Sequence, residues 1–159
     1  MKGMVVYDSL HGNTKQVAEA VAAVLKGAGD VGVRHVGEVE AHELSSLDLL
    51  VVGAPTHVFQ PSSGAKKFLK SIPSDGLKDV KVAVYDTRIS REDTDSGVLS
   101  FLIGLFGYAA KPMAERLKRK GGTLAVPPEG FCVEDTEGPL KAGELDRARE
   151  WSRRLASVE

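Results

Sequence analysis

The chain has 159 residues, 42% of them hydrophobic, which is enough to bury one core but too few for two full-sized domains. Its 21 basic residues nearly balance its 22 acidic ones, which argues against a nucleic-acid-binding surface. No apolar run approaches the ~18 residues of a transmembrane helix, and no signal-peptide layout is present. The lone Cys132 excludes an internal disulfide and fits a reducing compartment. We therefore expect a single cytoplasmic domain over residues 1–159, with neither a nucleic-acid nor a membrane partner.

The first predicted strand and the first predicted helix enclose a turn of small and polar residues. Residues 4–7 form an apolar, β-branched run, and Val17, Val21, Val24 and Ala28 then recur at helical spacing. Between them stands Ser9-Leu10-His11-Gly12-Asn13-Thr14. Such a turn often serves only as a helix N-cap. However, the first turn of a helix has four unpaired N–H groups and a partial positive charge, so we predict a phosphate-binding loop.

The remainder of the chain alternates strands and helices. Further strands are predicted at residues 31–36, 47–53, 80–85 and 123–126, with a turn at Ala54-Pro55-Thr56 after the third strand. Helices are predicted over residues 65–72 and 108–120. A final helix is predicted as well, with Leu145, Ala148, Trp151 and Leu155 on its inner face. This alternation implies a parallel sheet with helices on both faces. Ligands of such sheets bind beyond the carboxyl ends of the strands, where loops 8–14, 54–64 and 86–107 should converge.

The loop predicted at residues 86–107 is much longer than the ~4–6 residues typical of compact domains. Its first half, residues 86–95, is polar, whereas Val98 to Phe106 is too apolar for an exposed loop. Two interpretations of this apolar half are left open: a short inserted helix that covers the ligand, or a homodimer contact through Val98 to Phe106.

Several classes of phosphate-binding protein are excluded by residue type. The first loop has neither G-x-x-x-x-G-K-[ST] nor G-x-G-x-x-G, so nucleotide triphosphatases and dinucleotide-binding folds are disfavoured. Cys132 lies outside that loop, which excludes a cysteine phosphatase there. The third strand ends in Gly53-Ala54-Pro55 rather than in the aspartate of a phospho-acceptor domain. A phosphomonoester held by amides and hydroxyls, and attached to a larger group, remains.

The first loop resembles the FMN phosphate loop of flavodoxins, whose pattern is S/T-x-T-G-x-T. Residues 53–59 resemble the flavodoxin loop beside the isoalloxazine ring, and residues 137–145 resemble C-terminal segments of flavodoxin-like proteins. The resemblance implies an α/β, doubly wound, five-stranded parallel sheet of order 2-1-3-4-5 with helices on both faces. It implies cofactor contacts from three segments: Ser9, Leu10, His11, Gly12, Asn13 and Thr14; Pro55, Thr56, His57, Val58 and Phe59; and Asp86, Thr87 and Arg88.

The same resemblance implies an electron-transfer flavoprotein that binds FMN without a covalent bond and passes electrons from a reductase to an acceptor protein. An FMN-dependent NAD(P)H or quinone oxidoreductase of the same fold is the alternative, so we leave open whether the chain is an enzyme. A flavodoxin-like binding module without FMN is a third, weaker alternative. No catalytic residue is expected, and the spacing of the four histidines suggests no metal site.

Three positions depart from the flavodoxin pattern. His11 replaces a hydroxyl residue, and a nearby phosphate dianion would favour its protonated form. No glycine lies between Gly53 and Gly64. In many flavodoxins a peptide of this loop flips when the flavin takes up one electron, and its carbonyl then accepts the new N5 proton. The flip needs positive φ, which Val58 is expected to resist. The third loop lacks the usual tyrosine. Arg88 could instead meet the electron-rich edge of the flavin, or pair at the surface with Glu92 or Asp93.

Overall fold

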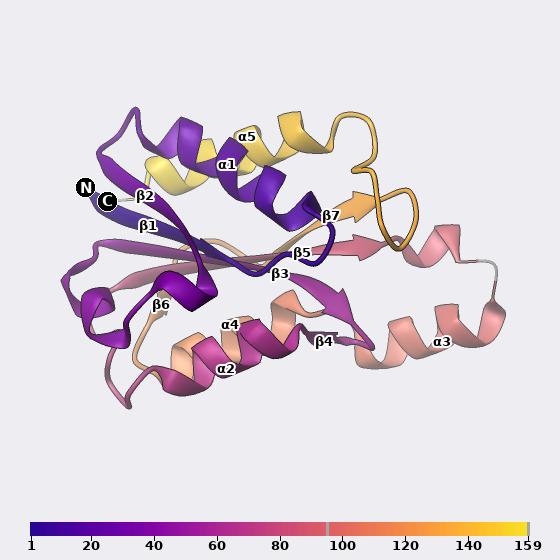
Figure 1. Ribbon diagram of the computed structural model, residues 1–159, viewed down its shortest axis with the longest axis horizontal. Coiled ribbons are helices and arrows are strands. Elements are labelled where there is room, and N and C mark those ends of the chain that lie inside the picture. The colour runs from indigo at the N-terminus through magenta and orange to yellow at the C-terminus, as the bar shows by residue number, and fades with distance from the viewer. Residues whose placement is uncertain (95, 159) are drawn as a thin grey trace.

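The computed structural model describes residues 1–94 and 96–158, without the side chains of residues 105 and 106; Asp95 of the predicted polar half-loop lies outside these described residues (Figure 1). One sheet of parallel strands forms the centre of the molecule, in the order β2-β1-β3-β5-β6. β7 extends the far edge by pairing with β5, and β4 adds an antiparallel pair to β3. The strands are β1 (Lys2–Tyr7), β2 (Asp30–His35), β3 (Leu49–His57), β4 (Gln60–Pro61), β5 (Lys81–Ile89), β6 (Thr123–Leu124) and β7 (Glu129–Val133).

The predicted sheet order is confirmed, but its last strand is divided in two. β6 has only two residues and pairs with the start of β5, with Leu124 opposite Val82. β7 pairs with the end of β5, where Glu129 lies opposite Tyr85. Residues 127 and 128 are both proline, which cannot donate ladder hydrogen bonds, so the strand is interrupted there. β7 does not correspond to any strand predicted from the sequence.

Helices cover both faces of the sheet (Figure 1). α1 and α5 pack together on one face, and α2 and α4 on the other. The inserted helix α3 is confirmed; it lies beyond the strand ends, beside β4. The helices are α1 (Asn13–Leu25), α2 (Ser63–Ser71), α3 (Gly97–Phe106), α4 (Ala110–Arg119) and α5 (Glu144–Ala156), with short 3₁₀ turns η1 (Val36–Glu38), η2 (Ala41–Ser46) and η3 (Arg91–Asp93). Among the described residues, no helix is both long and apolar enough to cross a bilayer.

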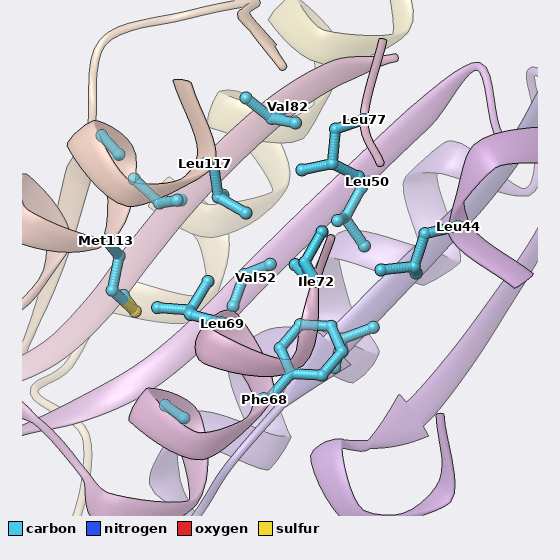
Figure 2. Close-up of a cluster of buried hydrophobic side chains, with 14 of the residues drawn as sticks. Leu44, Leu50, Val52, Phe68, Leu69, Ile72, Leu77, Val82, Met113 and Leu117 are labelled. Carbon is cyan, nitrogen blue, oxygen red and sulfur yellow. The ribbon is translucent and has the colours of Figure 1, made fainter. Parts of the chain in front are cut away.

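Each face of the sheet buries its own hydrophobic cluster. Figure 2 shows the α2/α4 side, where Phe68, Leu69, Met113 and Leu117 pack on β3 and β5. On the other side Trp151 of α5 meets β5 and β7. The predicted apolar stripe of α1 is partly wrong, because Val24 is only half-buried and Ala28 is exposed beyond the helix end. The buried face consists of Val17, Ala18, Val21, Ala22 and Leu25.

Two strands run further than the sequence analysis predicts. β3 continues through the predicted turn at residues 54–56, and β5 continues through residues 86–89 of the predicted loop. These extensions pair with each other, with Ala54 opposite Asp86 and Pro55 opposite Thr87. Pro55 has no N–H to donate, but β1 ends at Tyr7, opposite Gly53, so no partner strand on that side of β3 needs a donor from Pro55. The hydrogen-bonded pairing therefore overrides the local turn signal.

Candidate functional site

The segment between β1 and α1 presents unpaired donors at the carboxyl edge of the sheet. Gly12 is the N-cap of α1, at φ 89° and ψ −8°, and provides no side chain to cap the helix. No acidic residue stands in the first turn, so the helix start keeps its partial positive charge. The Gly12 N–H donates to Ser9 Oγ over 3.0 Å, which folds the loop back on itself. This end of α1 is therefore suited to an anion.

Buried hydrogen bonds hold the start of α1 against the sheet. Thr14 Oγ1 lies 2.8 Å from Thr87 Oγ1 of β5. The Tyr85 hydroxyl donates to the Thr14 carbonyl over 2.9 Å, and both groups are buried. Asn13 Nδ2 donates to the carbonyl of Glu137 over 3.2 Å, which fixes the segment after β7. The first turn of α1 is therefore rigidly placed.

Asp8, which the sequence analysis did not single out, anchors the beginning of the same loop. Its nearly buried carboxylate accepts the Ser9 N–H at 3.0 Å and the Ser62 hydroxyl at 2.5 Å. His35 Nε2 lies 3.2 Å from the same carboxylate, while His35 Nδ1 accepts the Gly37 N–H. Asp8 thus connects the loop to β2 and to the N-cap of α2. Its position directly before Ser9 was the available signal, but its partners are remote in sequence.

A hollow of about 90 Å³ brings the three predicted segments together. Its lining includes nine predicted residues: Ser9, Leu10, His11, Asn13, Thr14, Pro55, Thr56, Thr87 and Arg88. Gly12 lies within the loop that forms one wall, whereas His57, Val58, Phe59 and Asp86 do not line this hollow. Ile89, Val133 and Thr136 line it as well and were not predicted. Ile89 and Val133 lie at the ends of β5 and β7, and the sequence did not reveal how far these strands extend.

Asp86 and Arg88 form an ion pair in which the carboxylate is fully buried and the guanidinium is partly exposed. Asp86 is 0% exposed and accepts from Arg88 Nε at 2.5 Å, from Arg88 Nη2 at 2.7 Å and from the Ala110 N–H at 2.8 Å. Burial raises the pKa of Asp86, and the hydrogen bonds from Arg88 and Ala110 oppose that rise. The predicted alternative that Arg88 pairs with Glu92 or Asp93 is therefore wrong.

The Arg88 guanidinium also stacks on an aromatic ring. Its Cζ lies 3.8 Å from the centre of the Tyr108 ring, and the Tyr108 hydroxyl donates to the carbonyl of Ile89 over 3.1 Å. Tyr108 follows α3, so it reaches this position from beyond the inserted segment. Arg88 is held from two sides and still lines the hollow, where it presents a fixed positive charge.

The tip of the β3–β4 hairpin has a strained backbone. His57 pairs with Gln60, and the two residues between them, Val58 and Phe59, have φ of 47° and 64°. Positive φ at both central residues defines a type I′ hairpin turn, which Asn-Gly adopts easily and a β-branched residue does not. The expectation that Val58 avoids positive φ is therefore wrong. This exposed tip stores strain beside the site.

A second hollow of about 400 Å³ adjoins the first and has Thr56 and Ile89 in common with it. No charged residue is among its described lining. The described part of α3 lines this second hollow and contributes nothing to the first. The lining consists of Thr56, Val58, Phe59, Ile89, Thr94, Leu99, Leu102, Ile103 and Tyr108. Phe106, named in the predicted apolar segment, has its side chain outside the described residues.

Comparison with known proteins identifies the family. A model of the flavodoxin domain matches residues 4–127. A flavodoxin of Aquifex aeolicus (strain VF5) is 37% identical over 87 residues, which cover 52% of this chain but only 46% of that protein. A flavodoxin from the domain Archaea superposes with a TM-score of 0.72 at 23% identity, over 98% of this chain and 96% of its own. Flavodoxin 1 from Bacillus cereus gives 0.74 at 18% identity, over 100% and 99%. The chain belongs to the flavodoxin family.

Proposed function

We propose that this chain binds FMN without a covalent bond and carries electrons between a reductase and an acceptor protein in the cytoplasm. The observation that carries the proposal is the start of α1, where an uncapped helix end and the hydroxyls of Ser9 and Thr14 face one small hollow. Neutral donors of this kind suit the phosphate of a mononucleotide. Members of the flavodoxin family typically bind FMN, which agrees with this donor set.

The residues in and around the first hollow fall into two groups, one for the phosphate and one for the flavin ring. Ser9, Gly12, Asn13 and Thr14 would hold the phosphate, and segments 55–59 and 86–88 would flank the flavin ring. Bound FMN supplies the one- and two-electron chemistry of its ring, and the protein orients it and sets its electrostatic surroundings. Arg88, fixed by Asp86 and Tyr108, would place its positive charge near the ring and favour a reduced, anionic flavin.

The proposal is tested by the absorbance of the purified protein and by titration of the flavin-free protein. We expect flavin bands in the purified protein and tighter binding of FMN than of riboflavin, which lacks the phosphate. Equal affinities for the two would contradict a phosphate-binding role of the loop. Transfer of electrons from the reduced, FMN-loaded protein to a soluble haem protein would then test the carrier role.

The second hollow favours one further candidate, an FMN-dependent oxidoreductase that reduces a quinone. Its apolar walls and three hydroxyl-bearing residues, Thr56, Thr94 and Tyr108, suit a small uncharged aromatic molecule with carbonyl oxygens. Steady-state oxidation of NAD(P)H with a soluble quinone separates the two candidates. An enzyme would lose this activity when Ile103, which is 8% exposed, is replaced by Trp, and would keep it in Val98→Trp on the exposed side of α3.

A further inference from the structure

The helices on one face of the sheet carry a concentrated positive charge. α2 and α4 contain seven basic residues and a single acidic one, Glu115. All seven side chains belong to exposed residues. The two helices lie next to each other on the same side of the sheet (Figure 1). This basic face consists of Lys66, Lys67, Lys70, Lys111, Arg116, Lys118 and Arg119.

The charges of the basic face are not neutralised within the protein. Lys118 pairs with Glu115 at 3.0 Å, and the other six form no ion pair with any described residue. The opposite face is different, because the arginines of α5 each have a carboxylate partner. Arg149 pairs with Asp146, Arg153 with Glu150, and Arg147 with Glu144 and Glu129. With a net charge of −1 for the whole chain, the basic face is a local excess.

An exposed apolar helix lies on the same side of the sheet. Figure 1 shows α3 on the side of α2 and α4, beyond the strand ends. α3 contains no charged residue. Val98 and Phe101 are 71% and 63% exposed, so they do not contribute to the lining of the second hollow. Because they are three residues apart on one helix, Val98 and Phe101 are neighbours and form one continuous apolar surface. Continuous exposed apolar surfaces are typical of contact sites.

We propose that the basic face and α3 together rest on an anionic lipid surface. Lysine and arginine side chains would contact the headgroup phosphates, and Val98 and Phe101 would enter the apolar boundary below them. Stable attachment without a transmembrane helix needs two signals of this kind, a basic cluster and an apolar insertion. The sequence contains no apolar run that could span a bilayer, which is why no membrane partner is expected from it, but a protein lying on the headgroups needs no such run.

The composition of the face favours lipid over other polyanions. Five of its seven residues are lysines, which are depleted at protein–protein interfaces, whereas headgroups attract lysine and arginine alike. Phe68, the aromatic residue of these two helices, is buried, so they present no ring on which a nucleic-acid base could stack. A nucleic acid would also not account for the exposed Val98 and Phe101.

Co-sedimentation of the full chain, with and without added FMN, tests the proposal directly. Vesicles of equal parts phosphatidylglycerol and phosphatidylcholine should bind the protein, vesicles of phosphatidylcholine alone should not, and added salt should weaken binding. Replacing Lys67, Lys70 and Arg116 by Gln should lower affinity about fivefold per charge, on the order of a hundredfold together. The matched control replaces Arg149, Arg153 and Arg154 by Gln on α5 and should retain binding.

Phe101→Ser tests the apolar part. It should weaken vesicle binding by a factor that does not depend on salt concentration, while light scattering shows the same mass as for the wild type. The proposal is overturned if wild-type protein ignores anionic vesicles, or if the α5 control loses as much affinity as the α2/α4 variant. It is also overturned if Phe101→Ser converts a dimer to a monomer without changing vesicle binding. Equal binding of a DNA oligomer by wild type and Phe101→Ser, without vesicle binding, would assign the face to nucleic acid instead.

Discussion

Gly53 of β3 lies directly opposite Tyr85 of β5, and the tyrosine ring fills the space that a side chain at Gly53 would occupy. A Cβ atom placed on Gly53 would overlap the ring. The Tyr85 hydroxyl donates to the Thr14 carbonyl, so this close approach allows the ring to reach under the start of α1. A small residue in the centre of the sheet thereby positions the loop between β1 and α1.

Gly53→Ala should destabilise the protein by about 3 kcal/mol, because a fully buried ring must move to admit one methyl group. Urea unfolding measures the change. Gly32→Ala is the matched control, since Gly32 is an exposed strand residue with no atom within 4 Å of an added Cβ. The control should change stability by less than ~1 kcal/mol. Similar losses in both variants would show that strand glycines matter for their backbone and not for the Tyr85 contact.

Thr14→Val should weaken FMN binding by on the order of tenfold to a hundredfold, because a hydrogen bond to a charged phosphate is worth ~1.5–3 kcal/mol. Riboflavin affinity should remain unchanged, since riboflavin has no phosphate. Fluorescence titration of the flavin-free protein measures both ligands. Thr87→Val removes the partner hydroxyl, 2.8 Å away, and should have the smaller effect on FMN. A parallel loss of riboflavin affinity in Thr14→Val would indicate a disturbed loop instead.

His11→Ala should weaken FMN binding by on the order of tenfold, because His11 is exposed and lines the first hollow, where its ring N–H can donate to a phosphate. His11→Thr keeps a hydroxyl donor and should lose less affinity. Riboflavin, which has no phosphate, serves as the control ligand and should bind all three proteins alike. Equal FMN affinities of the wild type and His11→Ala would overturn the role of His11.

The parts of the fold that depend on local pattern could be predicted, and the segment from β1 through α1 is the clearest case. An apolar strand, a polar turn and a helical stripe follow each other within residues 4–25, and all three signals agree. The ends of β3 and β5 could not be predicted because each exists through pairing with the other. Locally, Ala54-Pro55-Thr56 has the composition of a turn, and the parallel partner at Asp86 and Thr87 is remote in sequence.

The ion pair of Asp86 and Arg88 shows the same limit within the site. The resemblance to flavodoxins implies that both residues flank the cofactor, but the sequence alone places both in a loop and does not predict that they pair with each other. Once β5 extends to Ile89, residues 86 and 88 lie on one face of a strand, where they can pair with each other. The hairpin tip goes further, because the propensity of Val58 argues against its φ of 47°. Tertiary contacts decide both cases.

Glu144→Gln should lower stability at neutral pH by about 1 kcal/mol, with the loss disappearing in acid. The hydrogen bond from Arg147 lowers the pKa of Glu144, and the Cys132 N–H, 2.6 Å away, acts in the same direction. A lowered pKa in the folded state means stability that is present above the unfolded value and lost as pH falls. Wild type and variant should therefore converge between about pH 5 and pH 3.

The control for Glu144 is Glu150→Gln. Glu150 is 69% exposed and pairs with Arg153, which is 61% exposed, so its replacement should change stability by less than ~0.5 kcal/mol at any pH. Thermal unfolding at a series of pH values measures both variants. A Glu144→Gln protein that retains the full acid sensitivity of the wild type would show that other carboxylates are responsible.

Val58→Asn should raise the free energy of unfolding by about 1 kcal/mol, because asparagine tolerates positive φ and a β-branched residue does not. Val58 is 73% exposed, so little packing is lost with the apolar side chain. Val98→Asn is the matched control: Val98 is 71% exposed and sits in helix α3, where the same change relieves no strain and should not stabilise. Urea unfolding of both variants shows whether relief of backbone strain or the added polar side chain causes the gain in stability. If Val58→Asn leaves stability unchanged or lowers it, the hairpin tip is not strained, and the positive φ at Val58 costs nothing that evolution had to offset elsewhere in the site.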